Sequence, residues 1–264
     1  GAKKLGSSWL IPKETLKPAD PRQGKGQLNE TVLLVNPFDV DSMMMPLMNT
    51  PFLPGNCLDA VNIIASESQK NIVWAEYYYF TGQAEMAIPI AGDYLTSSNI
   101  EERLSACWIY GYANLTTGQI RQARRALKTV NALLADTTKV APESRAELAF
   151  VAFAIAVLLH LPVSERLPAI QDFAPLLPPG LRAFALYVQA HYLYLQGHYE
   201  KSCGIIEAAL TMGGSNYPIS AIYLHLAAVM NYMSLKQVDV AEQHLRDAWA
   251  LAQPDDLIEA FGEH

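Results

Sequence analysis

Charged side chains are scarce in this sequence of 264 residues, and the net charge they leave is negative. Lys and Arg number 19 against 26 Asp and Glu, which gives a formal net charge of −7 at pH 7. Binding of nucleic acid depends on a cationic face that neutralises phosphates and releases counterions. The composition therefore argues against a chain that binds DNA by itself, although it leaves room for a local basic patch.

Cysteine is rare, and apolar runs are short. Cys57, Cys107 and Cys203 are too far apart in the sequence to form a metal or redox motif, so we expect buried, reduced thiols in a cytoplasmic protein. The longest apolar run, Leu148–Leu159, has 12 residues. This is too short for the roughly 20 residues that span a bilayer. The N-terminal sequence also lacks the apolar core of a signal peptide. We therefore expect no membrane association.

The first 65 residues are rich in Pro, Gly and Asn and show no helical period. Prolines at 37, 46, 51 and 54 exclude a long helix. We expect an extended, partly disordered arm over residues 1–65, strand-like at Thr31–Val35. Its methionines, Met43–Met45 and Met48, are expected to dock on the first helices that follow. The alternative is an adaptable lip that binds a peptide.

Helical periodicity dominates residues 66–264, and four segments there are alike. In each, a helix rich in aromatic residues or Leu breaks at one residue, and a small residue follows five positions later. The four breaks and their small partners are Gly82 with Ala87, Gly118 with Ala123, Gly197 with Ser202, and Lys236 with Ala241. The breaks lie 36, 79 and 39 residues apart, so a further hairpin, split near Leu161–Pro162, is expected inside the longest interval. A fixed period of this size predicts a solenoid of helical hairpins.

This pattern resembles the tetratricopeptide repeat, in which a Gly closes the first helix and a small residue opens the packing face of the second. A small residue is needed there because two closely crossing helices tolerate no bulk at their contact. The resemblance implies an all-α fold, a right-handed superhelix of about five hairpins. The repeats are longer than the standard repeat of that family, and its consensus Trp and terminal Pro are mostly absent.

The same resemblance implies a concave inner surface lined by the first helices. Carrying the repeat positions over places nine candidate ligand- or partner-binding residues there: Glu76, Tyr79, Trp108, Tyr112, Tyr187, His191, Tyr194, Tyr223 and Met230. Tyr and Trp offer a large contact area with a polar tip, and Met adapts to varied shapes. The set favours a peptide, a helix or a small amphipathic molecule as ligand. The alternative is that these residues pack between repeats or lie under the N-terminal arm.

Signals of catalysis and metal binding are missing. The sequence has no phosphate-binding Gly-Lys-Ser/Thr loop, no dinucleotide-binding glycine pattern, no Gly-x-Ser-x-Gly elbow and no His-Glu-x-x-His pair. His191 and His225 fall on first helices of neighbouring repeats, but no third ligand is evident. We therefore expect no enzymatic activity, no cofactor and no metal site.

Basic residues gather in one segment, "RQARRALK". Arg121, Arg125 and Lys128, with Arg124 beside them, fall on one side of a second helix. We expect that side to face solvent, and a patch for an acidic partner is the alternative.

Two stretches, "WAEYYYFTGQAEMAIPIAGDYL" and "ERLSACWIYGYANLTTGQIRQARRAL", resemble the repeat region of LuxR-type bacterial transcription regulators of the MalT-like kind. The resemblance extends over approximately residues 70–264. It implies a sensor and self-association domain that binds a small-molecule or peptide inducer, or a partner protein. DNA would be contacted only through a C-terminal helix-turn-helix domain that is absent from this sequence. The alternative is a standalone repeat scaffold for protein–protein interaction.

The last segment, "AWALAQPDDLIEAFGEH", is expected to finish the last repeat and to begin a new helix after Pro254. In the family that the chain resembles, the similar segment leads toward the helix-turn-helix. Leu257, Ile258 and Phe261 have nothing after them in the sequence to cover them. We therefore expect these three side chains to be exposed, and the natural chain to continue into the domain that reads DNA.

Overall fold

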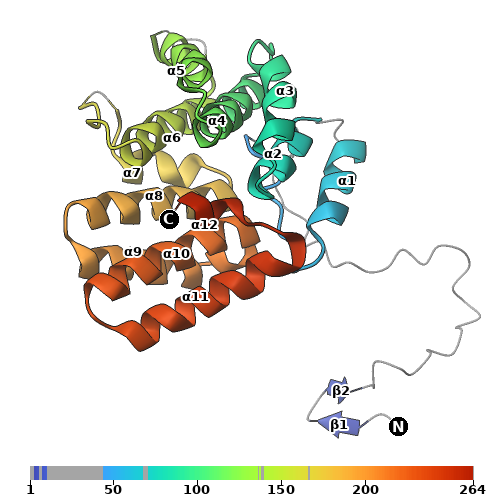
Figure 1. Ribbon diagram of the computed structural model, residues 1–264, viewed down its shortest axis with the longest axis vertical. Helices are drawn as coiled ribbons and strands as arrows, with labels where there is room; N and C mark the ends of the chain where they lie inside the picture. Colours follow the sequence, from blue (N-terminus) through green and yellow to red (C-terminus); the bar gives the residue numbers. More distant parts are fainter. Residues whose placement is uncertain are drawn as a thin grey trace, which may run out of the picture. The chain divides into compact units, whose positions relative to one another are not determined.

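The computed structural model (Figure 1) describes residues 3–5, 8–10, 44–67, 71–135, 137, 140–165 and 167–263. The chain divides into two units, Gly1–Thr31 and Val32–His264. In the first unit, β1 (Lys3–Leu5) and β2 (Ser8–Leu10) pair antiparallel, with Lys4 opposite Trp9. The strand predicted at Thr31–Val35 lies outside the described residues.

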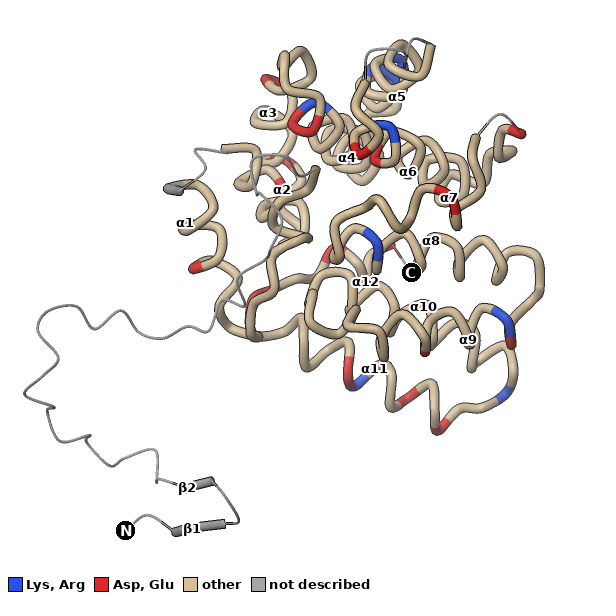
Figure 2. Tube along the Cα trace, turned by 180° about the vertical axis from the view of Figure 1, so that it is seen from behind, with Lys and Arg blue, Asp and Glu red and all other residues tan. Residues whose placement is uncertain are grey.

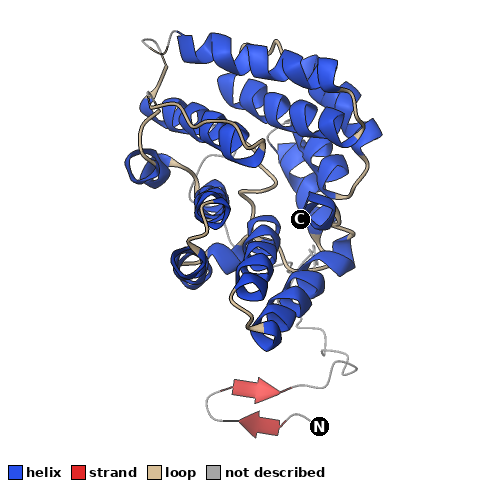
Figure 3. Cartoon of the chain, turned by 60° about the vertical axis from the view of Figure 1, so that its left-hand side comes forward, coloured by secondary structure: helices blue, strands red, loops and turns tan. Residues whose placement is uncertain are grey.

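The described part of the second unit is helical, which confirms the all-α prediction (Figure 3). Its α-helices are α1 (Cys57–Glu67), α2 (Ile72–Phe80), α3 (Ala84–Tyr94), α4 (Ile100–Thr116), α5 (Ile120–Ala135), α6 (Pro142–Leu158), α7 (Ile170–Phe173), α8 (Pro179–Leu195), α9 (Tyr199–Thr211), α10 (Pro218–Ser234), α11 (Val238–Ala252) and α12 (Glu259–Glu263). Three short 3₁₀ turns are η2 (Ala174–Leu176), η3 (Gly214–Asn216) and η4 (Gln253–Asp255). None of the described helices combines the length and the apolarity that crossing a membrane requires.

The long helices pack in consecutive pairs: α2 with α3, α4 with α5, α8 with α9, and α10 with α11. The first helices of the pairs also contact one another in sequence, from α2 through α4, α6 and α8 to α10. The first helices therefore form one layer, and the second helices pack against it. The four small residues predicted at these helix contacts, Ala87, Ala123, Ser202 and Ala241, are all buried, as the repeat pattern requires.

Five turns between paired segments share one construction. The backbone is left-handed at the four predicted breaks and also at His160 (φ 54°). Each turn contains a bond from a backbone N–H to the carbonyl five residues earlier, as in Gln83 N to Tyr78 O (2.7 Å) and Leu161 N to Ala156 O (2.7 Å). This bond is typical of the Schellman motif that ends helices. The break expected near Leu161–Pro162 is therefore a turn of the same type, with His160 in the position of glycine.

The third hairpin departs from the predicted pattern. After α6, the chain forms only α7 and η2, where a long second helix was expected. Pro162, Pro168 and Pro175 explain the difference, because proline cannot donate the backbone hydrogen bond that a helix interior needs. The described unit thus holds four pairs of long helices and one long helix followed by short segments.

The methionine-rich segment before α1 lies inside the unit. Met44, Met45, Leu47 and Met48 are buried among the first helices. Docking on the first helices is therefore confirmed for Met44, Met45 and Met48, whereas Met43 lies outside the described residues. The expectation of an extended arm through residue 65 is wrong, because residues 45–49 form turns and α1 already begins at Cys57.

Backbone groups of this segment are bonded to successive first helices. Met44 N donates to Glu147 Oε1 of α6 (3.0 Å), and Met45 N donates to Ser105 Oγ of α4 (2.9 Å). At the start of α8, a Cβ on Gly180 would lie 2.2 Å from the Met48 carbonyl oxygen. Only glycine permits so close an approach of the two backbones.

The segment after α11 returns to the beginning of the unit. The Asp255 carboxylate accepts hydrogen bonds from Gly55 N (2.7 Å) and Cys57 N (2.9 Å), and α12 packs on α2 and α10 (Figure 1). The expectation that Leu257 is exposed is wrong: it is only 2% exposed, and Phe261 is partly buried, whereas Ile258 is 46% exposed. The turn after α11 covers Leu257, because it carries the chain back over the first helices.

All three cysteines, Cys57, Cys107 and Cys203, are buried free thiols, as the sequence predicts. Burial raises the pKa of each of these thiols, so the reactive thiolate is disfavoured. Reduced, unreactive cysteine is the state that this packing supports.

Candidate functional site

The nine residues predicted to line a groove lie at three kinds of position. Trp108, Tyr79, Tyr187 and Tyr223 are at most 3% exposed and belong to the core between the first helices. Tyr112, His191, Tyr194 and Met230 are partly buried. Glu76 is fully buried. The inner face of the first helices is therefore covered by other parts of the chain.

Glu76 holds the methionine-rich segment. Its carboxylate accepts hydrogen bonds from Leu47 N (3.3 Å) and Met48 N (3.2 Å). In the same segment, Asn49 Oδ1 accepts from Leu181 N at the start of α8 (2.7 Å). Glu76 thus binds the chain's own backbone, in the way that a groove residue would bind an extended peptide.

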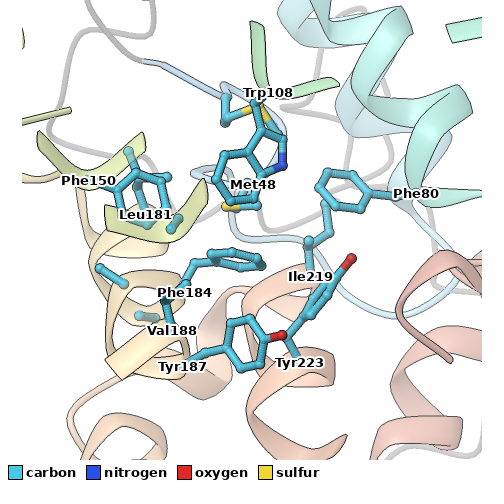
Figure 4. Packing of buried hydrophobic residues seen from close by; sticks show 14 of the residues in the cluster. Met48, Phe80, Trp108, Phe150, Leu181, Phe184, Tyr187, Val188, Ile219 and Tyr223 are labelled. Atoms are coloured by element: carbon cyan, nitrogen blue, oxygen red, sulfur yellow. The ribbon is translucent and has the colours of Figure 1, made fainter. Parts of the chain in front are cut away.

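The aromatic residues form one continuous cluster across the interior (Figure 4). The Trp108 ring stacks on Phe150 and meets Phe184 edge-on, with both centroid distances 5.6 Å. The Phe184 ring lies 4.9 Å from Tyr223, and Tyr187 lies 5.2 Å from Tyr223. Rings from α4, α6, α8 and α10 are thereby brought together, and Trp108, Tyr187 and Tyr223 pack in the core.

A carboxylate from α12 enters this cluster. The Tyr223 hydroxyl donates to Glu263 Oε2 (2.7 Å), and the Tyr79 hydroxyl donates to Glu263 Oε1. Within the described part of the chain, the Tyr112 hydroxyl is buried and has no hydrogen-bond partner. Its pKa is raised by burial and by the charge of Glu263, as is that of Tyr187. We define Tyr79, Tyr112, Tyr187 and Tyr223 as the tyrosine cluster.

The pKa of the Glu263 carboxyl is set mainly by its removal from water. Glu263 is exposed as a residue, but its carboxyl group is withdrawn among the rings, and this burial raises its pKa to about 7. The hydrogen bonds from Tyr79 and Tyr223 lower the pKa, and the charge of Glu259 raises it. Burial raises the pKa of all four hydroxyls well above the usual value, so they act as donors at neutral pH. The cluster offers uncharged O–H donors to one carboxylate.

Two residues of this candidate site, Glu259 and Glu263, are not among those predicted from the sequence. Glu259 is buried, and its Oε1 accepts a hydrogen bond from Thr116 Oγ1 at the end of α4 (2.9 Å). The sequence predicts for both a place in a helix that leads away from the repeats. Their role depends on the return of the chain after α11, for which the local sequence gives no signal.

An apolar pocket of about 190 Å³ lies between α4, α5 and α6. Tyr112 borders it together with Gly111, Leu127 and Ile155, and Arg124 stands on its rim. Arg124 belongs to the predicted basic segment, which faces solvent on α5 (Figure 2). Tyr112 therefore connects the tyrosine cluster to a space large enough for a small apolar group.

The histidines pair differently from the expectation. His191 neighbours His160 and Tyr187, with ring centroids 6.5 and 6.0 Å away. His225 Nδ1 instead lies 2.9 Å from His244 Nδ1. The pair that the structure brings together is thus on α10 and α11, within a single hairpin.

Comparisons with known proteins assign no family to the chain. No protein family, no curated protein and no solved structure matches it. The function of the chain therefore has to be inferred from the geometry of the tyrosine cluster and its carboxylate.

Proposed function

We propose that the chain is a helical-repeat recognition domain that senses a carboxylate-bearing ligand or partner at the tyrosine cluster. One observation carries this proposal: the Glu263 carboxyl is held by Tyr79 and Tyr223 beside the buried hydroxyl of Tyr112, which has no hydrogen-bond partner among the described residues. Glu263 occupies the site as an internal ligand. A ligand that presents its own carboxylate to the same donors competes with α12.

The wider role follows from the repeat pattern and from the resemblance to LuxR-type regulators of the MalT-like kind. In this proposal the paired helices form a right-handed, tetratricopeptide-like superhelix, and the inner layer of first helices is its recognition surface. Displacement of α12 changes self-association in a cytoplasmic regulator, whose DNA contacts belong to a helix-turn-helix domain outside this sequence. The shared turn construction and the layer of first helices support the repeat assignment.

The second candidate is a scaffold for protein–protein interaction. It is favoured by the methionine-rich segment, which lies across the first helices with its backbone bonded to Glu76, Ser105 and Glu147. This is how an extended peptide would be held. A scaffold would bind a partner protein without any downstream DNA-binding domain, and pull-down of a stable partner would support this reading over the regulator.

Displacement of α12 is feasible because little holds it. A helix of five residues is unstable by itself, so α12 persists only through its contacts with the rest of the unit, which include α2, α10, Thr116 of α4 and Trp249 of α11. Removing a carboxyl from water is unfavourable, and the two tyrosine hydroxyls offset only part of that cost. Segments with such sparse contacts open at low free energy, and a ligand that binds the open state shifts the population toward it.

The test uses the segment Leu257–Glu263 as a fluorescently labelled peptide added to the full chain. We compare the native chain with a variant in which Phe261→Ala and Glu263→Ala remove the internal competitor. The variant is expected to bind the peptide about tenfold more tightly, because the native chain is competent only while α12 is open. A peptide with Ala in place of Glu263 is the matched control and is expected to bind weakly, because it offers no acceptor to Tyr79 and Tyr223.

The second part of the test substitutes residues of the tyrosine cluster in the full chain. Adding Tyr79→Phe and Tyr223→Phe to the open variant removes two donors without removing the rings, and is expected to abolish the preference for the Glu peptide over the Ala peptide. Equal binding with and without the two hydroxyls would reject the tyrosine cluster as the recognition site. Free organic acids are then screened by thermal shift against the native chain and the open variant.

A further inference from the structure

Three metal-binding side chains meet on the outside of the last hairpin. His225 is on α10, and His244 and Asp247 are on α11. One donor atom of each residue lies within 4.8 Å of the donor atoms of the other two. His244 and Asp247 are three positions apart and therefore share one face of their helix. The packing of α11 on α10 places that face against His225.

The separation of the two imidazoles is that of two ligands on one metal ion. His225 Nδ1 and His244 Nδ1 are 2.9 Å apart. Nitrogens bound about 2.05 Å from one ion lie about 3.3 Å apart at a tetrahedral angle and about 2.9 Å apart at a right angle. A metal ion therefore fits between the two rings with adjustments of a few tenths of an ångström, and the Asp247 carboxylate is in reach to complete a three-ligand face.

The imidazoles are in the protonation state that a metal requires. Burial and the neighbouring His244 lower the pKa of His225 to about 4, and burial lowers that of His244, although Asp247 acts in the opposite direction on both. Metal ions bind neutral imidazole, so proton competition at neutral pH is weak. Without a metal ion, the two neutral imidazoles form one hydrogen bond, in which the Nδ1–H of one ring donates to the Nδ1 of the other.

Neighbouring side chains hold the His244 ring in place. The Tyr232 ring stacks on it at 5.5 Å and 10°, and the Tyr232 hydroxyl donates to Glu207 of α9. Stacking restricts the orientation of the His244 ring, and a ring of fixed orientation loses less freedom when it binds an ion. All three donor residues are half-buried, so one side of the cluster is open to water.

We propose that His225, His244 and Asp247 form a binding site for a divalent transition-metal ion of the zinc type, with water at the open position. Imidazole and carboxylate donors suit Zn²⁺, and three protein ligands with an open position are one of its established arrangements. The ion links α10 to α11, and α11 carries Trp249, whose ring meets Phe261 of α12 at 5.7 Å. Metal binding therefore has a fluorescent reporter two residues from Asp247.

The test titrates zinc chloride into the full chain, without a polyhistidine tag and after chelator treatment, by calorimetry and by tryptophan fluorescence. We expect one saturable site per chain and a rise in Tm that chelator reverses. His244→Gln and Asp247→Asn are each expected to weaken binding at least about tenfold. His198→Gln, at an exposed position before α9, is the matched control and leaves binding unchanged.

Two results would overturn the proposal. Absence of saturable zinc binding means that the histidines make only their mutual hydrogen bond. Equal affinity of the native chain and the His244→Gln variant means that zinc binds elsewhere on the surface. Thermal unfolding of each variant in chelator verifies that it is folded, and Asp247→Asn provides a second reading, because its half-buried side chain can change without loss of packing. Neither result depends on the tyrosine cluster or its ligand.

Discussion

Raising the pH through 7 is expected to release α12 from the tyrosine cluster. The pKa of Glu263 is raised from 4.5 to about 7 in the docked state, since its carboxyl is withdrawn from water. A carboxyl with a raised pKa stabilises docking fully below its free pKa, and this stabilisation is lost as the pH rises through the docked pKa. Docking is therefore stronger at pH 6 than at pH 8.5.

The magnitude follows from the size of the shift. A shift of this size corresponds to an upper limit of about 3.4 kcal/mol. Because the rest of the Glu263 residue is exposed, solvent screening reduces the expected effect to about 1–2 kcal/mol. Most of this effect is lost between pH 4.5 and 7, so the open fraction of α12 changes by at most about fourfold between pH 6.5 and pH 8.5. The pKa values of His225 and His244 are lowered from 6.5, so these two residues change their charge below pH 6.5 and not between pH 6.5 and pH 8.5.

The assay is the fluorescence of Trp249, whose ring loses contact with Phe261 when α12 leaves. The native chain is expected to show a transition with a midpoint near pH 7, whereas Glu263→Gln, which cannot ionise, is expected to show none. Glu85→Gln, on the exposed face of α3, is the control for unrelated carboxylates. An unchanged transition in Glu263→Gln, or a flat profile in the native chain, would refute the assignment of the switch to this carboxyl.

Three further predictions concern stability and are measured by denaturant unfolding. Gly180→Ala is expected to destabilise the fold by about 3 kcal/mol or more, because its Cβ would lie 2.2 Å from the Met48 carbonyl oxygen; a smaller loss would mean that the segment moves away freely. Glu76→Ala is expected to cost about 3 kcal/mol, since it removes the acceptor of the Leu47 and Met48 N–H groups, and an effect below about 1 kcal/mol would contradict this role. Lys236→Gly is expected to stabilise the fold by about 0.5–1 kcal/mol, because φ is +61° at this position, whereas no gain would show that the turn is unstrained.

Local sequence was sufficient to predict the turns. Gly82, Gly118 and Gly197 adopt the left-handed backbone that glycine favours, and Lys236 adopts it too, because the repeat spacing fixes the turn. The fifth turn was placed within two residues but not identified with His160, since a histidine carries no signal for positive φ beyond that spacing. Turn geometry depends on a few neighbouring residues, which explains why the prediction succeeds.

Features that depend on distant parts of the chain could not be predicted. The sequence indicated that Met44, Met45 and Met48 dock, but not that their backbone is held by carboxylates and a hydroxyl of the first helices. Glu76 was expected to face a ligand, and its carboxylate binds Leu47 and Met48. A sequence pattern indicates which face of a helix is inward, but the partner on that face depends on how the ends of the unit meet.

The return of the chain after α11 is the clearest example. Leu257 looked uncovered because the sequence ends shortly after it, yet the left-handed backbone at Asp256 (φ 54°) directs the chain back, and Asp255 then bonds the start of α1. The bond from Leu257 N to Ala252 O (3.1 Å) repeats the construction of the five hairpin turns. The turn at Asp256 is thus a local feature of the backbone. Where it directs the chain depends on contacts between the two ends of the unit, which local sequence does not show.

The two internal occupants of the first-helix layer are held in different ways, and this difference decides which of them a ligand can replace. The segment 44–49 has its backbone donors bonded to buried side chains of α2, α4 and α6, so its release would leave several buried polar groups unsatisfied at once. Helix α12 contributes side-chain bonds from Glu259 and Glu263, and both carboxylates regain water when they leave. Opening of α12 therefore costs less than release of the methionine-rich segment. If the proposed function holds, we expect a ligand to exchange with α12 at the tyrosine cluster while the methionine-rich segment stays in place.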